Sequence, residues 1–261
     1  MIETVRKPAV AGTFYPGSSA ELGDTVDRLL AAITPKRGPC PKAIIVPHAG
    51  YIYSGAIAAS AFARVLPHKN QITRVVLIGP AHRVFVDGLA APAASRLATP
   101  LGELPIDSDA VRELGVRLDA AAHAREHSLE VELPFLQKLC PRARVIAMCG
   151  SSARPDEVAA VLDRLWGGPE TLIVISSDLS HYLPYAEGRA LDERTAQQIV
   201  ALDPTVEGEH ACGSIGINGL LWLARVKGMR AELVDLRSSG DTAGSRDEVV
   251  GYGGFAFYEA A

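Results

Sequence analysis

The stretch Ala43-Ile44-Ile45-Val46-Pro47-His48-Ala49-Gly50-Tyr51 decides the fold. A short apolar run bounded by turn residues predicts a buried strand, here one that ends at His48. The pattern recurs in residues 75–82, which end at His82, and in residues 172–181, which end at His181. Ligands of open α/β sheets bind outside the carboxyl ends of the strands. Three strand-end histidines therefore indicate a functional site at that edge.

Helical patterns separate the apolar runs. Strands alternating with helices predict an α/β fold with a mostly parallel central sheet flanked by helices, in a single domain over residues 1–261. Residues 97–106 suit a hairpin or loop, and Pro134 delays or kinks a helix that opens near Ser128. Further strands are expected at 143–148, 231–236 and 249–258, and helices at 20–32, 55–65, 107–116, 156–165, 185–201 and 213–226.

Bulk composition narrows the class of protein. The 261 residues are 48% hydrophobic and 21% charged, with a net charge of −4. No basic excess suggests nucleic acid or an anionic membrane as partner. The four cysteines form no CxxC pair, which favours a reduced compartment. With no apolar run long enough for a membrane span and a polar N-terminus, the sequence predicts a soluble cytoplasmic protein.

His48 and His82 are candidate metal ligands. Each lies shortly after a proline at a strand end, and neutral imidazole is the commonest transition-metal ligand. One such histidine is an ordinary strand-end cap, whereas two from adjacent parallel strands could meet at one ion. Two histidines and a carboxylate suit non-haem Fe(II). The candidate third donors are Asp178, Asp241, Asp247, Cys212 and Glu130.

Each remaining candidate has a structural alternative. Asp241 is either a ligand or a turn residue of a Gly/Ser loop. Asp178 could orient His181 as a general acid/base, or the segment could cap a helix. His127 lacks the second histidine of H-E-x-x-H, and a helix N-terminus presenting His127 and Glu130 to the cleft is favoured. Cys212 is either a reactive thiol at a helix N-terminus or a buried packing residue.

Several motifs together resemble the Memo family, whose bacterial and archaeal members are called AmmeMemoRadiSam system protein B. They are PAVAGTFYP (8–16), PHAGYIYSG (47–55), GPAH (79–82), EHSLE (126–130) and SSDLSH (176–181). The resemblance implies a fold like that of the class III extradiol ring-cleavage dioxygenases, in which two histidines and an acidic residue hold non-haem iron.

The resemblance also implies roles for individual residues. His48 and His82 match the family's metal histidines, and Asp178 and His181 match its motif residues near the metal, with His181 as the acid/base. The human member is similar and uses a Cys as third ligand, expected in the loop before the last strand. This chain has no Cys in that loop, and Asp241 falls closest. The family name implies an AMMECR-type protein and a radical SAM protein as pathway partners.

Three hypotheses follow. The first is a metal-dependent redox enzyme that uses Fe(II), or else copper, on an unidentified substrate. The second is a non-catalytic adaptor that binds a small ligand or peptide in the same cleft, which Phe14, Tyr15, Tyr51 and Tyr53 could line. The third is a hydrolase with a metal-bound water, which would favour zinc.

Overall fold

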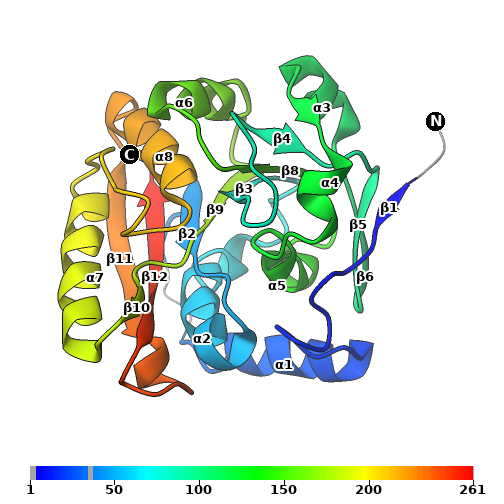
Figure 1. Cartoon of the computed structure of the whole chain (residues 1–261). Coiled ribbons are helices and arrows are strands. Elements are labelled where there is room, and N and C mark those ends of the chain that lie inside the picture. The colour runs from blue at the N-terminus through cyan, green and yellow to red at the C-terminus, as the bar shows by residue number, and fades with distance from the viewer. Residues whose placement is uncertain (1–3, 35–37, 261) are drawn as a thin grey trace.

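Strand β2 (Ala43–Val46), predicted from the opening stretch, lies inside a mixed sheet. The computed structural model describes residues 4–34 and 38–260, and across them the sheet has nine strands (Figure 1). The strand order is β10-β12-β2-β9-β3-β8-β4-β7, with β11 paired to β12. The α/β fold class is therefore confirmed.

The centre of the sheet is parallel and apolar. It contains β2, β9 (Thr171–Ser176), β3 (Arg74–Pro80) and β8 (Arg144–Gly150). Nearly every residue of these strands is buried, as continuous Val/Ile/Leu runs require when helices cover both faces. The strands β2 and β3 are not neighbours, because β9 lies between them. The expectation that His48 and His82 follow adjacent strands is thus wrong.

Antiparallel strands complete the sheet at both sides. Strand β12 (Val249–Tyr258) pairs antiparallel with β2, with β11 (Arg230–Ser238) and with the short β10 (His181–Leu183). On the other side β4 (Ala90–Ala91) pairs antiparallel with β8 and parallel with β7 (Arg117–Leu118). The sheet is therefore mixed around a parallel centre.

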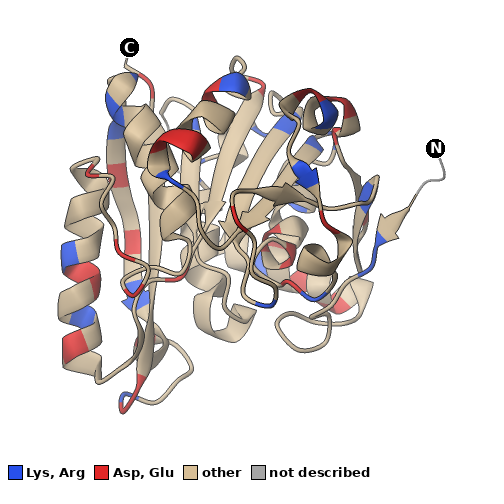
Figure 2. Ribbon diagram, turned by 45° about the horizontal axis from the view of Figure 1, so that its top comes forward, with Lys and Arg blue, Asp and Glu red and all other residues tan. Residues whose placement is uncertain are grey.

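Helices cover both faces of the sheet. Two residues on opposite faces of β12 show this, since Gly254 faces α2 and Gly251 faces Asp192 of α7. One layer contains α1 (Ser19–Ala31), α2 (Tyr51–Phe62) and α5 (Leu133–Leu139). The other contains α6 (Pro155–Arg164), α7 (Tyr185–Val200) and α8 (Ser214–Val226). Figure 2 shows that charged residues gather on helices and loops and largely avoid the central strands.

The remaining elements flank the main sheet. The predicted hairpin over residues 97–106 is confirmed as β5 (Arg96–Thr99) and β6 (Gly102–Pro105), joined by β1 (Val5–Arg6). The other elements are η1 (Leu66–His68), α3 (Ser108–Leu114), α4 (Ala120–Ala124), η2 (Glu130–Glu132) and η3 (Ser239–Asp241). Within residues 4–34 and 38–260, no helix combines the length and apolar character of a membrane span.

Candidate metal centre

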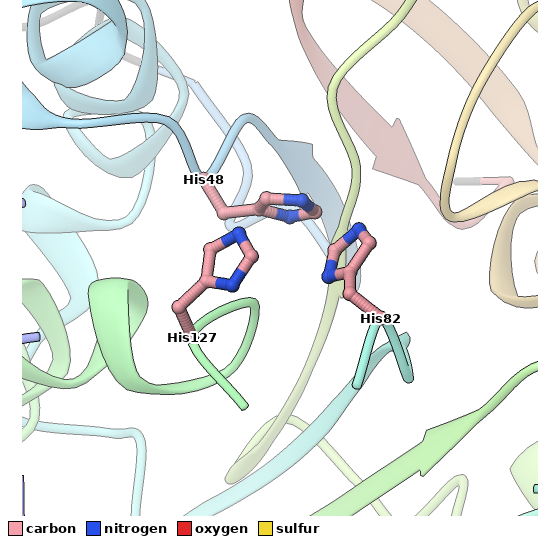
Figure 3. A group of neighbouring side chains, drawn as sticks. All are labelled: His48, His82 and His127. Carbon is pink, nitrogen blue, oxygen red and sulfur yellow. The ribbon is translucent and has the colours of Figure 1, made fainter. Parts of the chain in front are cut away.

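Three imidazole rings converge at the carboxyl edge of the sheet (Figure 3). His48 follows β2, His82 follows β3, and His127 precedes η2. One potential ligand atom from each residue lies within 4.8 Å of the other two. The rings of His82 and His127 stack with centroids 4.7 Å apart, while His48 stands edge-on to both. We call these three residues the His cluster.

The ring of His48 is held by the end of the strand that separates β2 from β3. Its Nδ1 lies 2.7 Å from Oγ of Ser176, the last residue of β9. Its backbone N–H donates to Oδ1 of Asp178, also over 2.7 Å. Because Nδ1 is engaged, Nε2 is the nitrogen of His48 that remains for a ligand.

The ring of His82 is held by Glu126. Oε1 of Glu126 lies 2.9 Å from Nδ1 of His82, and Oε2 accepts the backbone N–H of His82 over 2.6 Å. Oε1 also accepts the backbone N–H groups of His127 and Ser128. Burial alone would raise the pKa of Glu126, but the hydrogen bonds from His82 and Ser128 and the charge of His82 hold it well below its usual range. Glu126 is therefore a carboxylate that orients two residues of the His cluster.

Burial keeps His48 and His127 in the form that binds metals. It lowers the pKa of His48 well below its usual range, and the neighbouring imidazoles add to this effect. Burial also lowers the pKa of His127 to about 4. Nδ1 of His127 is buried and lies 3.4 Å from Oε1 of Glu126, without a hydrogen bond in the described residues. Neutral imidazoles with uncommitted nitrogens fit a transition-metal ion.

Cys212 is the nearest soft donor to the His cluster. It lies two residues before the start of α8, and its Sγ lies 3.4 Å from Nε2 of His48. Burial raises the pKa of Cys212 to about 12, so the side chain is a thiol when no metal is bound. The next residue, Gly213, has no room for a side chain, since a Cβ there would lie 2.5 Å from the carbonyl oxygen of Ser176. This close approach brings Cys212 to the end of β9.

The predicted catalytic pair lies beside the His cluster, not in it. Asp178 holds the backbone of His48, and burial raises the pKa of its carboxyl to about 7 against the opposing hydrogen bond from His48. His181 opens β10, and its ring packs edge-on against Tyr182. Burial lowers the pKa of His181. The acid/base roles of Asp178 and His181 stay predictions.

Asp241 is not part of the His cluster, and its role as a metal ligand stays a prediction. It ends η3, where Oδ1 accepts from the Tyr185 hydroxyl over 2.6 Å and Oδ2 accepts from the backbone N–H of Ser238 over 2.9 Å. The carboxylate therefore caps its own turn, the alternative that the sequence left open. His127 is the third member of the cluster instead, and the Cys beside the cluster is Cys212, outside the loop before β12.

Glu130 faces the N-terminal segment, although the sequence had offered it as a metal donor. Its oxygens accept from the backbone N–H groups of Ala9 and Val10 and from the Tyr15 hydroxyl, and it pairs with the Arg6 guanidinium. We call residues 5–15 the N-terminal strap. The strap also places the Phe14 ring 4.8 Å from the ring of His127. It thereby forms one apolar side of the candidate centre.

Sequence reasoning did not assign two residues of the site. His127 was expected to face the cleft but was not named as a ligand, and Glu126 was given no role. Their signal is the adjacent pair Glu126-His127, since a carboxylate commonly orients a metal-ligating imidazole. Glu126 orients a histidine outside this pair as well, because it binds the ring of His82, which lies far away in sequence.

The chain matches one protein family over most of its length. A family model described as Memo-like protein matches residues 6–256. The chain belongs to the Memo family. A MEMO1 family protein of Aquifex aeolicus is 39% identical, with 97% of this chain and 99% of the relative aligned. One from Archaeoglobus fulgidus is 34% identical, over 97% and 99% of the two chains.

The Memo-family fold also has a match among solved structures. The uncharacterized protein JW3007 from Escherichia coli K12 superposes with a TM-score of 0.51. The match covers 80% of this chain and 98% of that chain, at 14% sequence identity. At this level of identity the likeness shows a shared fold.

Proposed function

We propose that this Memo-family chain binds a transition-metal ion through His48, His82 and His127 and acts as a metal-dependent oxidoreductase. The observation that carries the proposal is the convergence of three imidazoles from three separate segments, two of which, His48 and His127, burial keeps neutral. Polar groups hold Nδ1 of His48 and Nδ1 of His82 and leave the Nε2 atoms for an ion. Hydrogen-bonding groups that orient the ligand histidines in this way are typical of a metal site.

Fe(II) is the proposed ion, with copper and zinc as competitors. Imidazole suits all three, and the fold resemblance favours iron. A bound iron ion would supply Lewis acidity and redox chemistry. Cys212 would offer a further donor through Sγ, and Asp178 would keep His48 in place through its backbone. His181, at the margin of the site, would donate or accept a proton at its ring.

The test is anaerobic titration with Fe²⁺, followed by metal quantification. His48→Ala, His82→Ala and His127→Ala should each weaken binding by about 100-fold or more, since each removes one ligand. His210→Ala is the matched control, because Nε2 of His210 lies 3.8 Å from Oε2 of Glu207 in its own turn and His210 is not part of the His cluster. Equal, negligible binding by the wild type and all three variants would reject the proposal.

The third ligand is tested in the same assay. We expect His127→Ala to lose affinity and Asp241→Asn to retain it, because the Asp241 carboxylate caps its own turn. The reverse ranking would restore the two-histidine, one-carboxylate site. A Cys212→Ser variant that binds less tightly would add Cys212 to the ligand set.

A partner-binding role is the second candidate function. Ile52, Phe85 and Tyr182 are large apolar side chains, each about 70% exposed, that closely follow His48, His82 and His181 in the chain. Exposed apolar side chains near a site favour a protein or peptide ligand. The proposed partners are an AMMECR-type protein and a radical SAM protein. A pull-down in which a His48→Ala/His82→Ala variant retains them would favour this role over catalysis.

A further inference from the structure

Ser176 Oγ, at the end of β9, is surrounded by three polar atoms. It lies 2.7 Å from Nδ1 of His48, 2.7 Å from the carbonyl oxygen of Ser128 and 3.1 Å from Oε1 of Glu132. Ser176 and Glu132 are completely buried, so bulk water does not reach these contacts. The donors and acceptors of Ser176, His48, Ser128 and Glu132 must therefore pair with one another.

Counting hydrogens fixes that pattern. A hydroxyl has one proton to donate and two lone pairs to accept with. The carbonyl of Ser128 can only accept, so the Ser176 proton goes to it. His48 Nδ1 and Glu132 Oε1 must then both donate to Ser176 Oγ. The first requires the Nδ1–H tautomer of His48, and the second requires a protonated carboxyl at Glu132.

The surroundings of Glu132 agree with a neutral acid. The described residues give it no ion pair, and its Oε2 is buried without a hydrogen bond. An ionised carboxylate with an unpaired buried oxygen would be costly, whereas the carbonyl oxygen of an acid tolerates the position better. Burial accordingly raises the pKa of Glu132 well above its usual range.

We propose that Glu132 is a positioning residue of the metal centre: as a carboxylic acid it donates to Ser176 Oγ, which in turn accepts the Nδ1 proton of His48 and directs the Nε2 lone pair toward the His cluster. The positioning role of Glu132 rests on the proposed metal site. The proton positions on Glu132 and His48 do not require a metal and can be tested without one. The two histidines whose Nδ1 atoms are held by hydrogen bonds, His48 and His82, then differ in the charge of the group that holds them. His82 is held by the carboxylate of Glu126, which makes it the more basic ligand, and His48 is held by a neutral chain.

Infrared spectroscopy of the metal-free protein tests the protonation of Glu132. The measurement is made at a pH above the pKa of about 7 for Asp178 and about 6 for Asp192, so that both are ionised. We expect a carboxylic-acid C=O band that is present in the wild type, lost in Glu132→Gln and retained in Asp192→Asn. A wild-type spectrum without the band would overturn the proposal.

Nitrogen NMR of the histidine rings tests the second proton. We expect His48 to have its proton on Nδ1 in the wild type and in Glu132→Gln, whose amide can still donate to Ser176. Ser176→Ala removes the acceptor and should shift His48 toward the Nε2–H tautomer. A proton on Nε2 in the wild type would overturn the assignment.

Cobalt binding tests the positioning role. With Co²⁺ as the probe, Glu132→Gln should retain the wild-type affinity, and Glu132→Leu should lose about tenfold, as is typical for a residue that orients a ligand. Thermal unfolding of the metal-free variants shows whether each is folded. Wild-type affinity in a folded Glu132→Leu protein would overturn the role. A wild type that binds no Co²⁺ would instead count against the metal site, while the infrared and NMR results would still decide the state of Glu132.

Discussion

At the scale of single residues, the geometry of the candidate centre depends on Glu126. Its two oxygens accept four hydrogen bonds, from the ring and backbone of His82 and from the backbones of His127 and Ser128. One buried carboxylate thus joins the loop after β3 to the loop before η2. A charge-assisted hydrogen bond of this kind is stronger than a neutral one.

Glu126→Gln tests this role. The amide keeps one oxygen but loses the charge and places N–H protons toward donors, so the ring of His82 is no longer held. We expect metal affinity to fall by 10- to about 100-fold, with the overall fold retained. Isothermal titration with Fe²⁺ or Co²⁺ measures the loss, and Glu157→Gln, at an exposed position of α6, is the control. Unchanged affinity would mean that Glu126 serves packing alone.

The sequence predicted two of the three clustered histidines, because each ends an apolar run that can only be a buried strand. It could not predict His127 as a cluster member, since η2 and the loop before it follow no strand. The family resemblance placed the third ligand at Asp241, because Asp241 falls closest to the expected position in the loop before the last strand. The Tyr185 hydroxyl that engages Asp241 comes from a distant helix, a contact that local patterns do not encode.

At the scale of elements, the N-terminus of α8 docks against the end of β9. The contact depends on Gly213, where a Cβ would lie 2.5 Å from Ser176 O and 2.6 Å from Ser177 Cβ. Backbone atoms cannot yield as a flexible side chain can, so the helix end must move if a side chain is added. That movement would displace Cys212 from His48.

Gly213→Ala is therefore expected to lower the free energy of unfolding by about 1–3 kcal/mol, the usual cost of overpacking. It should also weaken metal binding. Gly208→Ala is the matched control, because the nearest atom to its Cβ is Ser214 Oγ at 3.8 Å. Urea denaturation of both variants measures the difference, and equal stability of the two would contradict the close-packing argument.

The N-terminal strap is a second element whose position depends on one residue. Glu130 is almost fully buried and holds the strap through Arg6, Tyr15 and two backbone N–H groups. Removing its charge leaves the Arg6 guanidinium, itself mostly buried, without a counterion. The loss of one partner of a buried ion pair is strongly destabilising.

Glu130→Gln should accordingly lower the free energy of unfolding by about 3–5 kcal/mol. Tyr15→Phe removes a single hydrogen bond to the same carboxylate and should cost only about 1 kcal/mol. Chemical denaturation gives both values. A Glu130→Gln protein no less stable than Tyr15→Phe would show that the ion pair contributes little.

Element boundaries show where local sequence signals fail. The helix α2 begins at Tyr51, directly after Gly50, whereas the sequence predicted a helix over residues 55–65. The Ser54 hydroxyl lies inside the helix and donates back to the carbonyl of Ala49, just before the helix. Strand β10 was missed because it is three residues long and pairs only with the end of β12. The start of α2 and the position of β10 both depend on tertiary contacts.

At the scale of the whole molecule, stability should depend on pH through Asp192. This residue of α7 is buried against β12, and burial raises the pKa of its carboxyl to about 6 from 3.8. The folded state therefore keeps the proton to higher pH than the unfolded chain does. The resulting destabilisation is absent below the unfolded pKa, grows between the two values and is complete above the folded pKa.

Asp192→Asn removes this dependence and keeps an oxygen to accept the backbone N–H of Ser180. The variant should match the wild type near about pH 3 and exceed its free energy of unfolding by about 3 kcal/mol at about pH 7. Urea denaturation across that range measures the difference. A constant difference would show that the Asp192 carboxyl does not change its pKa on folding.

The His cluster joins three loops that lie far apart in the chain and belong to different parts of the sheet edge. An ion shared by them would act as a reversible cross-link, present only in the native state. Its binding free energy would add to the resistance of the whole fold to heat, by about 2.7 kcal/mol when free metal is 100 times its dissociation constant. The melting temperature of the protein would then rise with the concentration of free metal, so metal binding could be measured without knowing the substrate.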